Sequence, residues 1–94
     1  MPSPVAGILR AVPAWVYLLR CADGTLYCGW TVDLERRLAA HNAGAGSRYT
    51  RSRLPVALAW SRPLPDQSAA RREEARIKSL PRTQKLALIV GRAK

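Results

Sequence analysis

Two apolar runs separated by a short turn signal constrain this chain more than any other feature. Residues 15–20 and 26–30 are rich in aromatic and branched side chains, and Ala22-Asp23-Gly24 lies between them. Such runs on either side of a glycine-containing turn are typical of two antiparallel strands. We therefore expect a β-hairpin around which the rest of the chain folds.

The length of the turn decides which side chains share a face of the hairpin. A three-residue loop with Gly24 at positive φ sets Leu19 opposite Tyr27 and Tyr17 opposite Gly29. Because side chains alternate with period two, both tyrosines then lie on one face with Gly29. The other face carries Val16, Leu18, Arg20, Leu26 and Cys28. A two-residue turn would shift the register by one and separate the tyrosines; we favour the longer loop.

Three later segments have the spacing and end signals of helices. Thr31 or Asp33 caps a helix that ends near residue 43, and Asp66 or Ser68 caps a second that ends near residue 80. Residues 82–90 predict a third. Between the first two helices, residues 54–60 predict a third strand. Pro55 lacks an N–H, so we place this strand at a sheet edge or take the proline as its start, and Pro63 and Pro65 end it.

Basic residues strongly outnumber acidic ones. The 94 residues include 16 Lys and Arg against 6 Asp and Glu, a formal net charge of +10. This excess favours a polyanionic partner such as DNA or RNA. Composition bias is the alternative explanation, because arginine, alanine and proline are all abundant. The length allows one domain with one modest core.

The two cysteines indicate a reduced protein. In the favoured register Cys21 and Cys28 project from opposite faces of the hairpin, so they are poorly placed to form a disulfide. Two cysteines and one histidine also fall short of a familiar zinc-binding pattern. The sequence shows neither a signal peptide nor a run long enough to span a membrane, and we expect a cytoplasmic protein.

At the hairpin the chain resembles the GIY-YIG nuclease family. The first motif of that family is present as Trp15-Val16-Tyr17 and the second as Tyr27-Cys28-Gly29, followed by a matching stretch over residues 31–42. Tryptophan stands for the first glycine, and valine and cysteine stand for the two isoleucines. Both tyrosines and the last glycine are kept. The similarity is to small stand-alone bacterial members, which resemble the catalytic domain of nucleases that cut branched DNA.

The resemblance implies the fold and the organisation of the chain. It implies an α/β (α+β) domain with a small three-stranded antiparallel sheet flanked by helices. We expect this domain to cover residues 14–90, after a flexible lead-in at residues 1–13 that contains three prolines and before a basic tail at residues 91–94. The three tryptophans are interpreted as core residues.

The resemblance also implies a catalytic set. Glu74 matches the metal-binding carboxylate, Arg37 the arginine that stabilises the scissile phosphate, and Tyr17 and Tyr27 the tyrosines that position or deprotonate the attacking water. Few carboxylates are present, so a single Mg²⁺ or Mn²⁺ held by one carboxylate and completed by waters and phosphate oxygens is the feasible site. The alternative for Glu74 is an intrahelical salt bridge. Helical periodicity alone does not decide which of the two adjacent glutamates, Glu73 or Glu74, is the metal ligand.

Other residues near the motifs have two interpretations each. His41 shares a helix face with Arg37 and either relays a proton or is a cap or surface residue. The catalytic base stays open between Tyr17, Tyr27 and a metal-bound hydroxide. Gly29 either lets a phosphate approach the strand or marks a bulge. Arg36 is interpreted as a contact to the nucleic-acid backbone or a solvated charge.

A glycine- and arginine-rich stretch follows the first helix. Residues 43–53 suit a mobile loop that closes over a phosphate backbone through Arg48, Arg51 and Arg53, with Tyr49 as a stacking surface for an unpaired base. A solvated connector is the alternative.

The resemblance, supported by the basic charge, implies a divalent-metal-dependent endonuclease that hydrolyses DNA phosphodiester bonds in repair or recombination. Branched or flapped DNA is the expected substrate, and a protein partner would supply specificity. The competing hypothesis is a non-catalytic or partner-dependent module that binds DNA or structured RNA.

Overall fold

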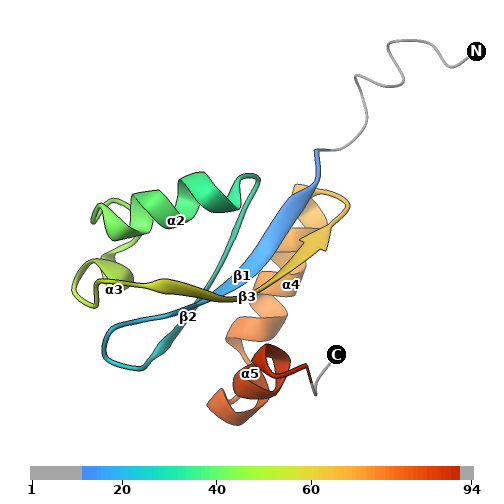
Figure 1. The fold of residues 1–94 in the computed structure, drawn as a ribbon. Helices are drawn as coiled ribbons and strands as arrows, with labels where there is room; N and C mark the ends of the chain where they lie inside the picture. The colour runs from blue at the N-terminus through green and yellow to red at the C-terminus, as the bar shows by residue number, and fades with distance from the viewer. Residues whose placement is uncertain (1–11, 92–94) are drawn as a thin grey trace, which may run out of the picture.

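A three-stranded antiparallel sheet lies at the centre of the computed structural model, which describes residues 12–91. The strands are β1 (Ala14–Arg20), β2 (Leu26–Thr31) and β3 (Ala57–Leu64), in the order β2-β1-β3. The helices are α2 (Leu34–Asn42), α3 (Arg48–Arg51), α4 (Gln67–Lys78) and α5 (Arg82–Ile89). α2 and α3 lie on one side of the sheet and α4 and α5 on the other (Figure 1). The predicted fold class is confirmed.

The hairpin has the register that the three-residue loop predicts. Tyr17 pairs with Gly29 and Leu19 with Tyr27. At the turn, the Cys21 N–H donates to the Thr25 carbonyl at 2.9 Å, and Gly24 has φ +85°. The two motif tyrosines therefore share one face of the sheet.

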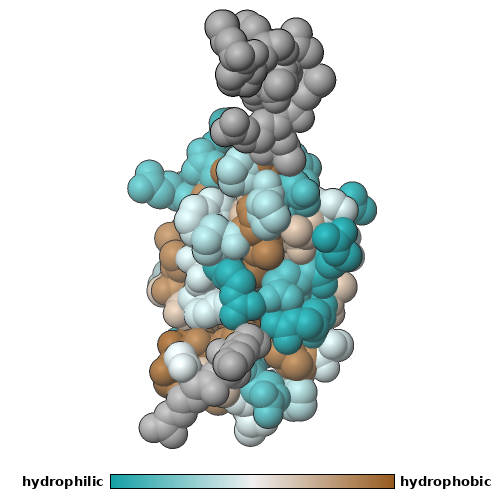
Figure 2. All heavy atoms as spheres, turned by 90° about the vertical axis from the view of Figure 1, so that its right-hand side faces the viewer, coloured by the Kyte–Doolittle hydropathy of each residue, from teal (hydrophilic) through white to brown (hydrophobic). Residues whose placement is uncertain are grey.

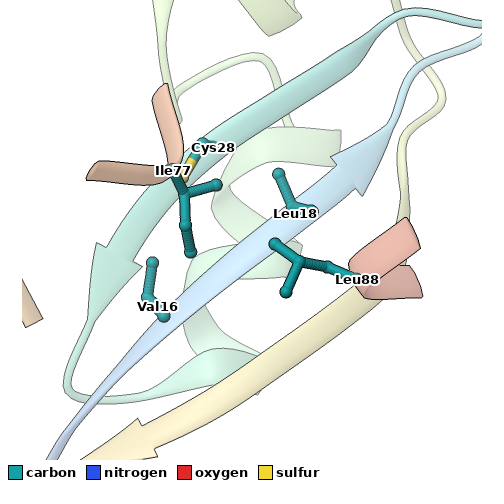
Figure 3. Packing of buried hydrophobic residues seen from close by; sticks show 5 residues of the cluster. All are labelled: Val16, Leu18, Cys28, Ile77 and Leu88. Atoms are coloured by element: carbon teal, nitrogen blue, oxygen red, sulfur yellow. The ribbon is translucent and has the colours of Figure 1, made fainter. Parts of the chain in front are cut away.

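Each face of the sheet has its own apolar cluster. On the side of α4 and α5, the buried residues are Val16, Leu18, Cys28, Ile77 and Leu88, whose side chains meet between the strands and the helices (Figure 3). On the other side they are Tyr17, Leu19, Cys21 and Val56, with leucines 34 and 38 of α2 packed against them. Seen from the α4 and α5 side, hydrophilic residues cover the middle of the surface and apolar residues lie lower (Figure 2). Because β1 is the central strand, it contributes to both clusters.

Side-chain caps explain where two of the helices begin. The Asp33 carboxylate accepts from the Arg36 N–H at 3.1 Å at the start of α2, and the Asp66 carboxylate accepts from the Ala69 N–H at 2.7 Å at the start of α4. Aspartate at this position satisfies one of the backbone donors that a first turn leaves free. Asp33 rather than Thr31 therefore caps α2, and Asp66 rather than Ser68 caps α4.

The third strand lies later in the chain than predicted. We expected a strand over residues 54–60 closed by Pro63, but β3 runs from Ala57 to Leu64 and includes that proline. β3 pairs only with β1 and is therefore an edge strand, where a proline without an N–H is tolerated. Before the strand, Asn42 takes both backbone groups of Val56, donating to its carbonyl at 3.0 Å and accepting from its N–H at 2.8 Å. The edge placement was correct and the bounds were not.

The stretch predicted as a mobile loop contains a short helix. α3 begins after Ser47, whose hydroxyl accepts from the Thr50 N–H at 3.1 Å. The sequence signal was present as a serine cap, but the surrounding glycines and arginines favoured a loop. This correction matters because α3 packs beside α2 and supports the site described below.

Two further expectations are resolved by burial. Cys21 and Cys28 are buried, unpaired and in different clusters, as the favoured register implies. The three tryptophans are only half-buried, so they are not the core residues we expected; Trp60 packs at the margin of the α4 and α5 cluster.

Within residues 12–91 no helix is long and apolar enough to cross a membrane. Most of the predicted lead-in and tail lies outside the described residues.

Candidate active site

The polar residues of the first helix and the hairpin meet on the α2 side of the sheet. Tyr17 of β1 is 2% exposed, and its hydroxyl lies 2.9 Å from Nε2 of His41, a fully buried residue of α2. Nδ1 of His41 lies 2.8 Å from the hydroxyl of Thr50 in α3, which is also fully buried. These three side chains form one continuous hydrogen-bonded chain in the interior. His41 is therefore neither a helix cap nor a surface residue.

Burial sets the protonation state of this chain. Desolvation, reinforced by the positive charge of Arg37, lowers the pKa of His41 below 6.5, so its imidazole is neutral near pH 7. Desolvation raises the pKa of Tyr17 above 10, and this outweighs the opposing effect of Arg37. The described residues therefore hold Tyr17 as a neutral phenol near pH 7.

Arg37 connects this buried chain to the surface. Its Nε donates to the Tyr17 hydroxyl oxygen at 3.5 Å, and one terminal nitrogen donates to the Gly46 carbonyl at 2.9 Å. Arg37 also lines two adjoining cavities of about 410 and 390 Å³ that share Thr31 and Val32. Arg36 is exposed and lines only the first of them. The guanidinium of Arg37 thus has one edge held by protein and faces a space large enough for a phosphodiester.

Tyr27 and Gly29 complete the sheet face of the site. The Tyr27 ring lies edge-on to His41, with ring centroids 5.3 Å apart. At Gly29 the bulge that was one of two interpretations is absent, because the register continues through this residue, and the phenol of Tyr17 occupies the space that a Cβ would need. Glycine is required there because the Tyr17 ring lies directly against the backbone of β2.

The two glutamates of α4 have different surroundings. Glu73 forms ion pairs with Arg62 and with Arg76, and the hydrogen bond from Arg76 is the main reason that its pKa is lowered below 4.5. Glu74 forms one ion pair within the described residues, with Lys78 at 3.5 Å, and this is the intrahelical salt bridge that was the alternative for it. Glu73 is thus paired with two arginines, whereas Glu74 is paired with one lysine.

Glu74 lies on the opposite side of the sheet from the tyrosines. Its backbone carbonyl accepts from the Cys28 thiol at 3.9 Å, and its side chain lines a separate cavity with Arg71 and Arg72. Cys28 and Gly29 are consecutive residues of β2, and β2 is an edge strand. The tyrosine chain and Glu74 therefore lie on either side of one exposed strand edge, and no hydrogen bond or ion pair links them within the described residues.

The donor set limits which metal the site could hold. Within residues 12–91 no three His, Cys, Asp or Glu side chains come together as a metal-binding group. A site with one carboxylate fits Mg²⁺, which keeps several waters and uses one or two carboxylates together with substrate phosphate oxygens. Of the two glutamates of α4, Glu74 is the one that no arginine pairs with in the described residues.

The arginine-rich segment around α3 is divided between structure and surface. Arg48 and Arg51 are exposed. Arg53 instead pairs with Asp23 at 2.9 Å and lies over the ring of Tyr49 at 3.8 Å. Tyr49 also stacks on Tyr27, with centroids 5.8 Å apart, so the ring that we expected to stack on a base already has two neighbours. Arg48 and Arg51 remain the cations of this segment best placed for a phosphate backbone.

Sequence reasoning missed three residues at the site. Thr50 and Ser47 support His41, and Gln67 of α4 reaches the cavity that Arg37 lines. Thr50 follows His41 by nine residues across a change of direction, and no periodicity relates the two. The serine cap of α3 was the one available signal for this group.

Comparison with known proteins agrees with this geometry. The family model described as GIY-YIG catalytic domain matches residues 13–87. A UPF0213 protein of Nitratidesulfovibrio vulgaris is 54% identical over 81 residues, which covers 85% of this chain and 74% of that protein. A UPF0213 protein of Streptococcus agalactiae is 50% identical over 78 residues, covering 83% and 89%.

A solved structure also resembles the chain. The solution NMR structure of a UPF0213 protein from Bacillus halodurans has a TM-score of 0.54 and 38% sequence identity, and the match covers 83% of each chain. A second NMR structure, of a protein from E. faecalis, has the same TM-score and identity. Fold and sequence thus point to the same set of relatives.

Proposed function

The chain belongs to the GIY-YIG catalytic domain family, a family of nucleases, and on that premise we propose that it is a divalent-metal-dependent endonuclease acting on DNA. The observation that carries the proposal is the buried chain of Tyr17 and His41 with Arg37 at its outer end. A fixed cation beside a neutral phenol and a neutral imidazole is suited to phosphodiester hydrolysis, which needs both charge stabilisation and a route for a proton.

Arg37 would stabilise the phosphate. A guanidinium can donate two parallel hydrogen bonds to phosphate oxygens, and its effect is greatest when it is already oriented before the reaction. The Gly46 carbonyl holds one terminal nitrogen of Arg37, and the adjoining cavities leave room for the substrate. Preorganised positive charge at this position would stabilise the additional charge of the transition state.

Tyr17 and His41 would move the proton of the attacking water. The raised pKa of Tyr17 argues against a resting phenolate as the base. Instead, the Tyr17 oxygen accepts the water proton while the phenol proton passes to Nε2 of His41, 2.9 Å away, leaving hydroxide to attack phosphorus and an imidazolium behind. Tyr27 packs against His41 and limits its movement.

Glu74 would hold the divalent cation. It is the glutamate of α4 whose carboxylate is not taken up by arginines, and it lies beside the exposed edge of β2. A bound Mg²⁺ or Mn²⁺ would supply Lewis-acid stabilisation of charge on the phosphate and the leaving oxygen.

The charge of the molecule supports a nucleic-acid substrate. The formal net charge is +10, and Arg48 and Arg51 on α3 are exposed on the same side of the sheet as Arg37. These side chains would contact the phosphate backbone and set the register of the strand without reading its sequence. Branched or flapped DNA, as an intermediate of repair or recombination, is the substrate class that we propose, with a protein partner supplying specificity and the cytoplasm as the site of action.

One observation favours a second function. Within the described residues, Glu74 and the tyrosine chain lie on opposite sides of the sheet, and no hydrogen bond or ion pair joins them. If Glu74 and the tyrosine chain do not act on the same phosphate, the protein would be a nucleic-acid-binding module for DNA or structured RNA.

A cleavage assay separates the two functions. Purified protein is incubated with supercoiled plasmid and with flapped and branched DNA, in Mg²⁺, Mn²⁺ or EDTA. We expect metal-dependent cuts that are lost in Glu74→Gln and kept in the neighbouring control Glu73→Gln. Equal cleavage by both variants, or cleavage in EDTA, would overturn the metal assignment. Binding without cleavage in any metal would establish the second function.

A further inference from the structure

Two hydroxyls of α3 close the hydrogen-bonded chain behind His41. The Thr50 hydroxyl oxygen lies 2.8 Å from His41 Nδ1 and 2.9 Å from the Ser47 hydroxyl oxygen. Ser47 is the N-cap of α3, and its hydroxyl also accepts the Thr50 N–H at 3.1 Å. The first turn of α3 is thereby attached to the imidazole, although neither hydroxyl contacts the cavities beside Arg37.

The direction of the hydrogen bonds follows from the donors in the chain. Arg37 can only donate, so the Tyr17 oxygen accepts its Nε–H at 3.5 Å. Tyr17 is 2% exposed, and within the described part of the chain the acceptor for its hydroxyl proton is His41 Nε2. A buried hydroxyl proton without an acceptor is costly, so Tyr17 donates to Nε2.

This direction determines the tautomer of His41. A neutral imidazole carries one proton, and Nε2 is an acceptor here, so the proton is on Nδ1. The charged and titratable groups that face the ring are Arg37 of α2, Tyr17 of β1 and Tyr27 of β2, and none of them accepts a proton from Nδ1. The acceptor for Nδ1–H is the Thr50 hydroxyl.

The backbone before α3 holds the same two residues from a second direction. The Gly46 carbonyl accepts from Arg37 at 2.9 Å, and a Cβ on Gly46 would collide with the imidazole of His41. Residues 46–50 therefore contact both the phosphate-stabilising cation and the proton acceptor of the proposed site.

We propose that Thr50 is a positioning residue whose hydroxyl holds His41 as the Nδ1–H tautomer, so that Nε2 stays free to accept the Tyr17 proton. Thr50 touches no substrate atom and acts through His41. The purpose of this arrangement rests on the proposed nuclease function, but the tautomer itself does not, so the two can fail separately. A histidine that accepts a proton at one ring nitrogen needs a hydrogen bond at the other ring nitrogen, because that bond fixes the tautomer.

The first experiment measures the tautomer by ¹⁵N NMR of the full chain. The sequence has one histidine, so its ring nitrogens give unambiguous signals. In the wild type near neutral pH we expect Nδ1 to be protonated and Nε2 to be bare. Thr50→Ser keeps the hydroxyl and should keep this pattern, whereas Thr50→Val has nearly the same shape without it and should lose the preference for Nδ1–H. A wild type protonated on Nε2, or a valine variant with the wild-type pattern, would overturn the proposal.

A second variant covers the case in which Thr50→Val does not fold. Ser47→Ala removes the neighbouring hydroxyl and leaves Thr50 in place, so Nδ1–H must persist in it. Its loss would show that Thr50 does not hold the tautomer by itself. The wild-type measurement needs no variant and decides by itself which ring nitrogen of His41 is protonated, and a proton on Nε2 would overturn the proposal.

Cleavage kinetics then test the purpose of the tautomer. We expect Thr50→Val to lower kcat by about 10- to 100-fold, part of what a positioned acid–base group contributes, with KM changed by less than about twofold. Thr50→Ser should restore kcat to near the wild type. An unchanged kcat in Thr50→Val, with its tautomer altered, would mean that the tautomer does not serve catalysis. If the wild type cuts no DNA, the nuclease proposal fails, and the NMR result still decides the role of Thr50.

Discussion

The two sides of the sheet differ in the kinds of side chain that are buried against them. On the side of α4 and α5, Val16 and Leu18 of β1 belong to a cluster of buried apolar residues. On the side of α2 and α3, Tyr17, which lies between them in the strand, leads into a buried histidine and a buried threonine. One strand thus supplies an apolar cluster on one face and, beside a second apolar cluster, a polar chain on the other.

This difference separates stability from chemistry. Apolar burial stabilises the fold in proportion to the area removed from water, without needing directed contacts. A buried polar chain contributes little net stability and is expensive if one partner is lost, but it holds side chains in defined orientations. We therefore expect substitutions on the α4 and α5 side to act on unfolding and those on the α2 side to act on cleavage.

The largest effect should come from the cation of the α2 side. Arg37→Ala removes the group that is oriented toward the proposed phosphate site, and we expect cleavage to fall about 10³-fold. Arg36→Ala is the matched control, because it removes the same charge from the preceding, exposed residue, and it should cost no more than a few-fold. Single-turnover cleavage rates measure both; equal losses would contradict the assignment.

A pair of neighbouring residues tests the separation of the two faces directly. Leu18→Ala should lower the free energy of unfolding by about 3 kcal/mol, the usual cost of truncating a fully buried leucine. Tyr17→Phe should cost about 1 kcal/mol of stability but reduce cleavage by about 10²-fold, because the ring stays and the hydroxyl is lost. Urea unfolding and cleavage of the folded fraction measure both. A Leu18→Ala protein whose folded fraction has lost activity would argue against separable faces.

Acid should weaken the α2 side first. The pKa of His41 is lower in the folded protein than its usual 6.5, so the folded state binds its proton less readily than the unfolded chain does. This stabilising contribution is complete above about pH 6.5 and is lost as the pH falls through the folded pKa. The lowered pKa values of Glu73 and Asp23 have the same sign but act at lower pH.

Denaturant unfolding measured from pH 8 to pH 5 checks this expectation. The free energy of unfolding of the wild type should decrease on acidification over that range, and His41→Gln should show a flatter profile. A wild type that becomes more stable between pH 7 and pH 5 would contradict a buried neutral imidazole.

The smallest effect concerns surface charge. Arg51 on α3 is exposed on the proposed DNA side, and Arg82 on α5 is exposed on the other side. Arg51→Gln should reduce the slope of log affinity against log salt by about 1, the effect of one phosphate contact. Arg82→Gln should leave the slope unchanged. Duplex DNA binding at several salt concentrations measures both, and equal slopes in the two variants would place the DNA elsewhere.

Much of the fold could be predicted because its signals are local. The aspartate caps, the glycine in the turn and the apolar alternation of β1 each depend on neighbouring residues. The bounds of β3 were misplaced for two reasons: Asn42 takes up the backbone groups of Val56 just before the strand, and the edge strand accommodates Pro63 instead of ending there. α3 was missed because glycines and arginines around a one-turn helix outweighed its serine cap.

The candidate site was predictable to the extent that it follows motifs. The resemblance named Tyr17, Tyr27 and Arg37, and the structure places Arg37 against Tyr17 and the rings of both tyrosines against His41. The sequence did not distinguish a surface His41 from a buried one, because the spacing puts His41 on the same helix face as Arg37 without saying whether that face is buried. The catalytic roles of these residues, and that of Glu74, stay predictions until the cleavage assays are done.

By itself, the sequence favoured a three-residue turn, which with a side-chain period of two places both tyrosines on one face of the hairpin, and the observed register confirms this preference over a two-residue turn. Only the tertiary structure decided what lies behind them. Thr50 reaches His41 because α3 folds back onto α2, and Arg62 reaches Glu73 because β3 lies beside α4, although Arg76 within α4 already pairs with Glu73. Both contacts join residues that are distant in the chain, and such contacts depend on how whole elements pack rather than on any local pattern.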